Sequence, residues 1–152
     1  MRRNATYGAL CGIVTVSCLL AACDESLRTL AGPTPNLEPT FTSIQREIFA
    51  SSDSAGRASC TSCHQSAVGA PRAAGMSLAS DIAYESLVGK PSSRKSGAVL
   101  VVPGDPDRSY LIQKLEGNTS MVGRRMPTSP PYLTAGQMQI IRRWIQIGAP
   151  NN

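Results

Sequence analysis

The segment Cys60-Thr61-Ser62-Cys63-His64 places two cysteines three positions apart, with a histidine directly after the second. On one helical turn, positions i and i+3 lie on the same face, so both thiols can reach one flat ligand from one side. This spacing is the one used to attach a c-type haem, whose two vinyl groups form thioethers with the cysteines. The imidazole of His64 would then ligate the iron. Its other ring nitrogen needs an acceptor that fixes the ring and its tautomer, and we expect a carbonyl in the loop that follows.

Zinc, a redox dithiol and a plain disulfide are the alternatives for this segment. A structural zinc site takes four ligands. His64 is the only histidine, however, and the other cysteines, Cys11, Cys18 and Cys23, all lie near the N-terminus. A thioredoxin-like dithiol belongs to a βαβ unit, and no parallel-strand pattern surrounds Cys60. Covalent haem is therefore favoured, while a disulfide and an incomplete metal site remain as alternatives.

Length and composition suit one small domain that follows a leader. The chain has 152 residues, and aromatic residues make up only 5% of them, which is few for a protein core unless a large apolar cofactor fills its centre. Arg2 and Arg3 fall in the leader. The rest of the chain therefore holds 13 of the 15 basic residues and 10 acidic residues. No dense basic run interleaved with aromatic residues is present, and we expect no nucleic-acid partner.

Residues 1–22 are typical of a secretory signal peptide. Arg2 and Arg3 give a positive start, and Ala9 to Ala22 form an apolar stretch of 14 residues. A helix that spans a bilayer needs about 20 residues. The stretch therefore predicts export, which agrees with a haem that bacteria attach outside the cytoplasm.

Leu20-Ala21-Ala22-Cys23 resembles a bacterial lipobox, in which the cysteine is lipidated and becomes the mature N-terminus. Ordinary cleavage after a small residue is the alternative, but it would leave Cys23 as a reactive thiol in an oxidising compartment. We expect a lipid-anchored protein on the periplasmic or cell-surface side of a membrane.

Residues 23–40 are expected to form a tether. They include Pro33, Pro35 and Pro39 and show no sustained apolar period, which indicates an extended, semi-stiff linker. A disordered segment with no required reach is the alternative.

Apolar spacing predicts several helices in the domain, residues 41–152. We expect a short helix over 44–49, one that ends at Gly89 with Ser80 or Asp81 as its N-cap, and one over 110–115 that stops at Gly117, with Asp107 or Ser109 as its N-cap. The β-branched run 99–102 predicts a small strand or an extended buried segment.

The last helix has the clearest signals. Thr134 and Gln137 form a capping box, and apolar residues recur at three and four positions up to Gly148. Arg142 and Arg143 fall on the opposite, solvent-facing side. Phe49 and Trp144 are the predicted contact between the first and last helices of the domain.

The chain resembles the class I monohaem cytochrome c family, and most closely a bacterial exported branch of it. The resemblance covers essentially the whole domain, at residues 44–49, 60–64, 75–78, 83–89, 102–106, 109–115, 125–127, 133–134, 144–145 and 148–149. It implies a small all-α fold wrapped around one covalently bound haem c, with one short extended segment in the middle of this chain as a departure. It also implies histidine on one side of the iron and methionine on the other.

The sixth iron ligand cannot be a second histidine from this chain, which leaves methionine, lysine, water or an open position. Met138 falls on the apolar face of the last helix and is expected to pack in the core. Met76 follows the haem segment closely, so it is expected to pack on the proximal side of the haem as part of the core. Met121 and Met126 precede the last helix, where the family presents its ligand. The family pattern of methionine followed by proline falls on Met126, and Met121 is the alternative.

An iron with both axial positions filled by protein gains and loses one electron with little rearrangement. The resemblance therefore implies an electron carrier that is not an enzyme, with redox proteins as partners. Arg124 and Arg125 are expected to face haem propionates, an acidic partner or solvent. A haem-based sensor or peroxidase-like enzyme, in which Met126 leaves the iron, is the alternative function. A structural lipoprotein without haem is a third hypothesis.

Overall fold

The computed structural model describes residues 37–65 and 73–152. The predicted signal peptide, Cys23 and the predicted tether up to residue 36 lie outside these residues. Leu37 packs against the hydrophobic core, so packing begins shortly before the predicted domain boundary at residue 41.

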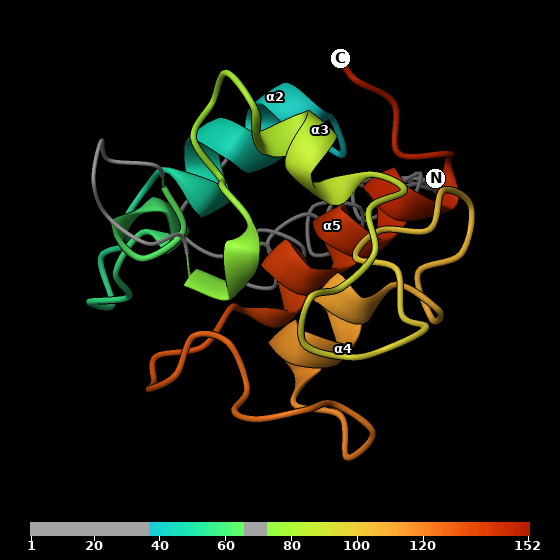
Figure 1. The fold of residues 1–152 in the computed structure, drawn as a ribbon. Helices are drawn as coiled ribbons and strands as arrows, with labels where there is room; N and C mark the ends of the chain where they lie inside the picture. Colours follow the sequence, from blue (N-terminus) through green and yellow to red (C-terminus); the bar gives the residue numbers. More distant parts are fainter. Residues whose placement is uncertain (1–36, 66–72) are drawn as a thin grey trace, which may run out of the picture.

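The described residues form helices joined by long loops, and no strand or sheet occurs among them. The elements are α2 (Phe41–Ile44), η1 (Gln45–Phe49), η2 (Cys60–Ser62), η3 (Ala73–Gly75), α3 (Ala83–Leu87), α4 (Tyr110–Glu116) and α5 (Ala135–Gln146). The prediction of an all-α domain is confirmed for this part of the chain. Figure 1 shows α5 between α2 on one side and α4 on the other, and both pack against it. None of the described helices is long and apolar enough to cross a membrane.

The first helix of the domain is longer than predicted, because it begins at Phe41, and α2 then continues directly into the π-helical turn η1. Thr40 caps α2 by accepting a hydrogen bond from the Ser43 N–H at 3.2 Å. The N–H of Ala50 then donates to the Gln45 carbonyl, five residues back, at 2.9 Å. A π-helical turn rotates the residues after it relative to an α-helix.

The contact between the first and last helices is made by Phe41. Its ring centroid lies 5.5 Å from that of Trp144, whereas Phe49 lines the cavity described below. The prediction placed the helix start at residue 44, three residues too late, and so missed Phe41. Both Phe41 and Trp144 are buried.

The N-cap predicted for the helix that ends near Gly89, which is α3, was wrong. α3 begins at Ala83, and neither Ser80 nor Asp81 caps it, since its N-cap position is Ile82, which makes no side-chain cap hydrogen bond. Instead, the buried Ser77 hydroxyl accepts from the Ala79 N–H at 3.2 Å. α3 therefore follows directly from a turn and begins without a side-chain cap.

α4 and α5 agree with their predictions. Ser109 occupies the N-cap position of α4, although its side chain makes no cap hydrogen bond, and Gly117 ends the helix in the left-handed conformation with φ 77°. In α5 the Thr134 and Gln137 capping box is present in full. Arg143 is exposed and Arg142 is partly exposed, which agrees with their predicted place on the solvent-facing side of the helix.

The run 99–102 is an extended segment rather than a strand of a sheet. Val101 is buried, but the segment makes only isolated bridges. Its backbone hydrogen bonds are divided between two neighbours: Leu100 N–H donates to Lys90 O at 2.8 Å, while Val99 O accepts from Tyr110 N–H at 2.9 Å. No continuous ladder forms because both partners are brief: Tyr110 begins α4, and Leu87, whose carbonyl accepts from the Val101 N–H, ends α3.

Candidate haem site

A cavity of about 390 Å³ lies between the 60–64 segment, η3, α4 and the loop before α5. Its walls are mostly apolar, with side chains of Phe49, Leu78, Leu111 and Leu115 among them. Volumes of about 300 to 1,000 Å³ with apolar walls and a few polar groups are typical of cofactor sites. Cys60, His64 and Met126 all line this cavity. Three of the four predicted haem residues are thus brought together.

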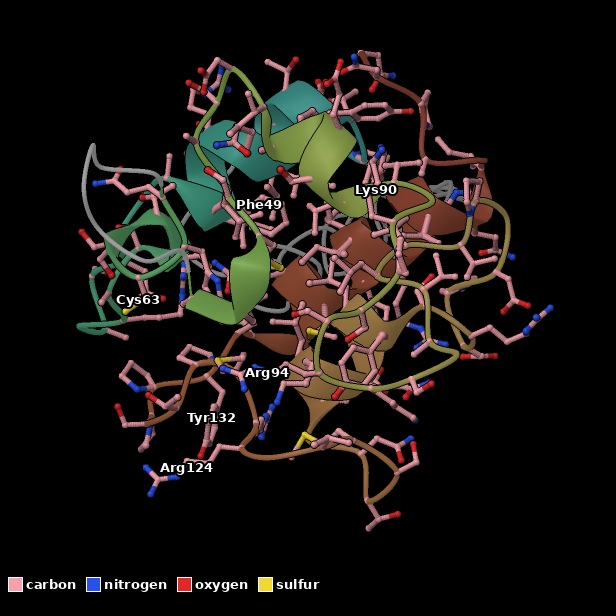
Figure 2. All side chains as sticks on the ribbon, in the orientation of Figure 1. Phe49, Cys63, Lys90, Arg94, Arg124 and Tyr132 are labelled. Atoms are coloured by element: carbon pink, nitrogen blue, oxygen red, sulfur yellow. The ribbon has the colours of Figure 1, made fainter. Side chains whose placement is uncertain are left out.

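The two cysteines differ in their surroundings. Cys60 begins η2 and is partly buried, whereas Cys63 follows the end of this turn and is exposed. Figure 2 shows Cys63 near the edge of the molecule, and Cys63 does not line the cavity. The backbone of Cys63, at the end of the turn, departs from ideal helical geometry, with φ −114°. Both are free thiols.

The environment of Cys60 is apolar and contains one cation. Burial raises the pKa of its thiol, and the nearby positive charge of Arg57 opposes part of that rise. The Arg57 Nη1 atom lies 3.9 Å from the sulfur. This thiol is therefore held mostly in its neutral form.

His64 has the acceptor that the sequence predicted. Its Nδ1 lies 3.1 Å from the carbonyl oxygen of Ala73. A carbonyl can only accept a hydrogen bond, so Nδ1 carries the proton and Nε2 is left with a free lone pair. Burial lowers the pKa of His64, and the Ala73 hydrogen bond opposes part of that change. A neutral imidazole with its orientation fixed in this way is the form that ligates metals.

Two methionines line the cavity. Met126 is one, and its N–H donates to the Lys114 carbonyl in α4 at 2.8 Å. Met76 is the other. It also packs against the core, and both placements agree with its predicted position in the core on the proximal side of the haem. Met121 is not among the lining residues, and Met138 packs against the core.

Basic side chains lie at the margin of the cavity. Arg94, Lys114 and Arg124 line it, and Arg124 points away from the rest of the molecule in Figure 2. Arg125 has a different place: its Nε donates to the Leu115 carbonyl at 2.7 Å, and its guanidinium stacks over the Tyr132 ring at 3.8 Å. Arg94 was missed because it lies in a polar loop about 30 residues before the ligand loop.

The donor set fits a haem. A thiol, an imidazole with a free Nε2 and a thioether face one apolar cavity, and these are the groups that bind and ligate a c-type haem. The second thiol, on Cys63, lies in the same short turn. Within residues 37–65 and 73–152, no three His, Cys, Asp or Glu side chains lie close enough to share a metal ion.

Comparisons with protein families, with curated proteins and with solved structures found no match.

Proposed function

We propose that this protein is a one-electron carrier, a monohaem c-type cytochrome tethered to a membrane on its extracytoplasmic side. The observation that supports this most directly is the meeting of Cys60, His64 and Met126 at one cavity, although Met126 lies more than 60 residues from the other two. A haem bound there supplies an iron that gains and loses one electron. This haem would be held within a cytochrome c fold.

Each cysteine has a defined role in attachment. The S–H of Cys60, and likewise of Cys63, adds across a vinyl double bond, so that one C–S and one C–H bond form while the S–H bond and the C=C π bond break. No net oxidation takes place. Because Cys63 is exposed, its side chain has to turn toward the cavity during attachment.

The axial ligands follow from the hydrogen bonds of the site. The Ala73 carbonyl fixes the tautomer of His64 and leaves Nε2 for the iron. Met126 is anchored through its backbone to α4, which favours a firmly held thioether over one that leaves easily. This anchoring favours a carrier over the alternative of a sensor or peroxidase-like enzyme. The apolar walls keep water away, which together with thioether ligation raises the potential.

The test is expression of the full chain with the cytochrome c maturation machinery, followed by an absorption spectrum and a redox titration. We expect a c-type spectrum, a mass increase of one covalent haem and reversible one-electron behaviour. Colourless protein without added mass would overturn the proposal. Rapid turnover of hydrogen peroxide, or carbon monoxide binding to the ferrous form, would favour the enzyme or sensor alternative.

Two variants serve as matched controls. Replacement of Cys60 and Cys63 by serine should abolish covalent attachment. Cys23→Ser should leave the spectrum unchanged but release the protein from the membrane fraction, since it removes only the proposed lipid attachment.

A further inference from the structure

Arg57 is a fully buried cation that pairs with the carboxylate of Asp53. Its side chain has 0% exposure, and that of Asp53 has 12%. A guanidinium stays charged at any accessible pH, and burying it unpaired would be costly. Arg57 Nε donates to Asp53 Oδ2 at 3.0 Å, and Asp53 Oδ1 accepts the Arg57 backbone N–H at 3.0 Å. The two residues form an ion pair in which Arg57 is buried and Asp53 is partly exposed.

Carbonyl groups fix the orientation of the Arg57 guanidinium. Nη1 donates to the carbonyls of Ile48 at 3.2 Å and Ala58 at 3.4 Å, and Nη2 donates to Ser51 at 3.5 Å. With Nε directed at Asp53, Nη1 is the corner that lies 3.9 Å from the Cys60 sulfur. The Cys60 sulfur also lies 3.8 Å from the Ile48 carbonyl oxygen. The positive end of the pair therefore lies against the attachment point.

We propose that Asp53 and Arg57 form an oriented ion pair that raises the reduction potential of the haem attached at Cys60. This inference rests on the proposed function. Once Cys60 is bonded to the porphyrin, its sulfur is a substituent of the ring, so Nη1 of Arg57 is held beside the ring edge. Asp53 contacts Nε, at a different corner of the guanidinium.

The direction of the effect follows from Coulomb's law. Oxidation of the iron adds positive charge, and a fixed cation nearby disfavours that change. The effect is stronger in a buried site, where the dielectric constant is low, than in water. Asp53 reduces the effect because it carries the opposite charge. Its pKa lies below the ordinary value, since burial raises it but hydrogen bonds from Arg57 outweigh that rise, so Asp53 is ionised at neutral pH.

A purely structural role for Arg57 predicts a different outcome. Arg57 also covers carbonyls at the end of η1, so its loss could loosen the wall of the cavity and admit water. Water beside the haem lowers the potential, whichever member of the pair is replaced. An electrostatic role instead predicts opposite signs for the two neutral variants. The Asp53→Asn variant keeps a side-chain oxygen. This oxygen can still accept the hydrogen bonds that Asp53 Oδ1 accepts from the N–H groups of Ala55 and Arg57.

The experiment is a spectroelectrochemical titration of the matured full chain at neutral pH and two ionic strengths. We expect a lower potential in Arg57→Gln and a higher potential in Asp53→Asn, relative to the wild type. The Arg57→Gln shift should persist at high salt, because the Arg57 side chain is fully buried, whereas the Asp53→Asn shift should shrink somewhat, because Asp53 is partly exposed. Arg142→Gln and Asp107→Asn are the matched controls. They neutralise an ion pair whose side chains are 33% and 80% exposed, and we expect little change from either.

The outcomes separate the hypotheses. Shifts of the same sign in Arg57→Gln and Asp53→Asn, or no shift in either, would overturn the ion-pair proposal and leave the electron carrier intact. If Arg57→Gln does not accumulate as folded protein, Asp53→Asn decides alone, and a potential at or below that of the wild type overturns the proposal. A wild-type protein without a c-type spectrum would overturn the proposed function itself.

Discussion

The ring of Phe41 packs against the indole of Trp144, with centroids 5.5 Å apart and an interplanar angle of 36°. Phe41 also meets Tyr84 edge to face at 5.2 Å, so the aromatic contact joins α2, α3 and α5. The Trp144 Nε1–H donates to the Pro150 carbonyl at 2.9 Å. The indole is therefore buried with its one polar group satisfied.

Trp144→Ala should lower the free energy of unfolding by about 3 to 5 kcal/mol, because it leaves a large cavity and removes the aromatic contact. Urea denaturation measures this. Ile147→Ala is the control, since Ile147 is 48% exposed, and it should change stability by about 0.5 kcal/mol or less. A loss well under 1 kcal/mol for Trp144→Ala would show that the helices do not depend on this contact.

Met126→Ala should abolish the near-infrared iron–sulfur charge-transfer band of the oxidised protein, because it removes the proposed thioether ligand. Met121→Ala and Met76→Ala are the controls and should keep the band. Met76→Ala is the more informative control, because the Met76 side chain lines the same cavity as Met126. Loss of the band in Met76→Ala and not in Met126→Ala would reassign the ligand.

Gly117→Ala should destabilise the protein by about 1 to 3 kcal/mol, since Gly117 adopts φ +77° and a Cβ there would lie 2.9 Å from Arg125 Cδ. Gly97→Ala is a matched control with φ +75° and nothing within 4 Å of its Cβ, and it should cost less. Arg125→Ala in the Gly117→Ala background should recover the steric part of the loss. Equal losses for the two glycine variants would show that backbone strain alone is responsible. Thermal denaturation of the wild type and these three variants measures this.

The Asp53 carboxylate should make stability fall in acid. Burial raises its pKa, but the hydrogen bonds and charge of Arg57 outweigh this, and the pKa lies below its ordinary value of 3.8. The folded state therefore binds fewer protons than the unfolded state in this range. The stabilisation is complete above the unfolded pKa and is lost as the pH falls through 3.8 toward the folded pKa.

Urea denaturation of wild type and Asp53→Asn at several pH values tests this. We expect the wild type to be more stable near neutral pH and the difference to shrink as the pH falls below about 4. A difference that stays constant down to about pH 2 would contradict the assignment.

Features encoded by neighbouring residues were predictable from the sequence. The start of α5 follows from Thr134 and Gln137, which lie within one turn, and the end of α4 follows from a glycine that tolerates positive φ. The carbonyl that holds His64 was predicted as a type of group in the following loop. Its identity as Ala73 required the fold, because a loop's path is not encoded by any short pattern.

Features that depend on distant packing were not predictable. Phe41 was left out of the first helix, and only the tertiary fold shows that its ring packs against Trp144. No sequence pattern indicated the burial of Arg57 either, since an arginine in a polar loop is usually exposed. The π-helical turn in η1 was missed because apolar spacing over six residues does not distinguish it from an α-helix.

Asn152 bonds to the first turn of α2. Its side-chain oxygen accepts from the Phe41 N–H at 3.0 Å, and its backbone oxygen accepts from the Thr42 N–H at 2.8 Å. Residues 40 and 152 therefore lie side by side, so a short peptide can join them. New ends opened in the exposed loop around Gly97 would fall between α3 and α4, so this circular permutation would cut none of the described helices.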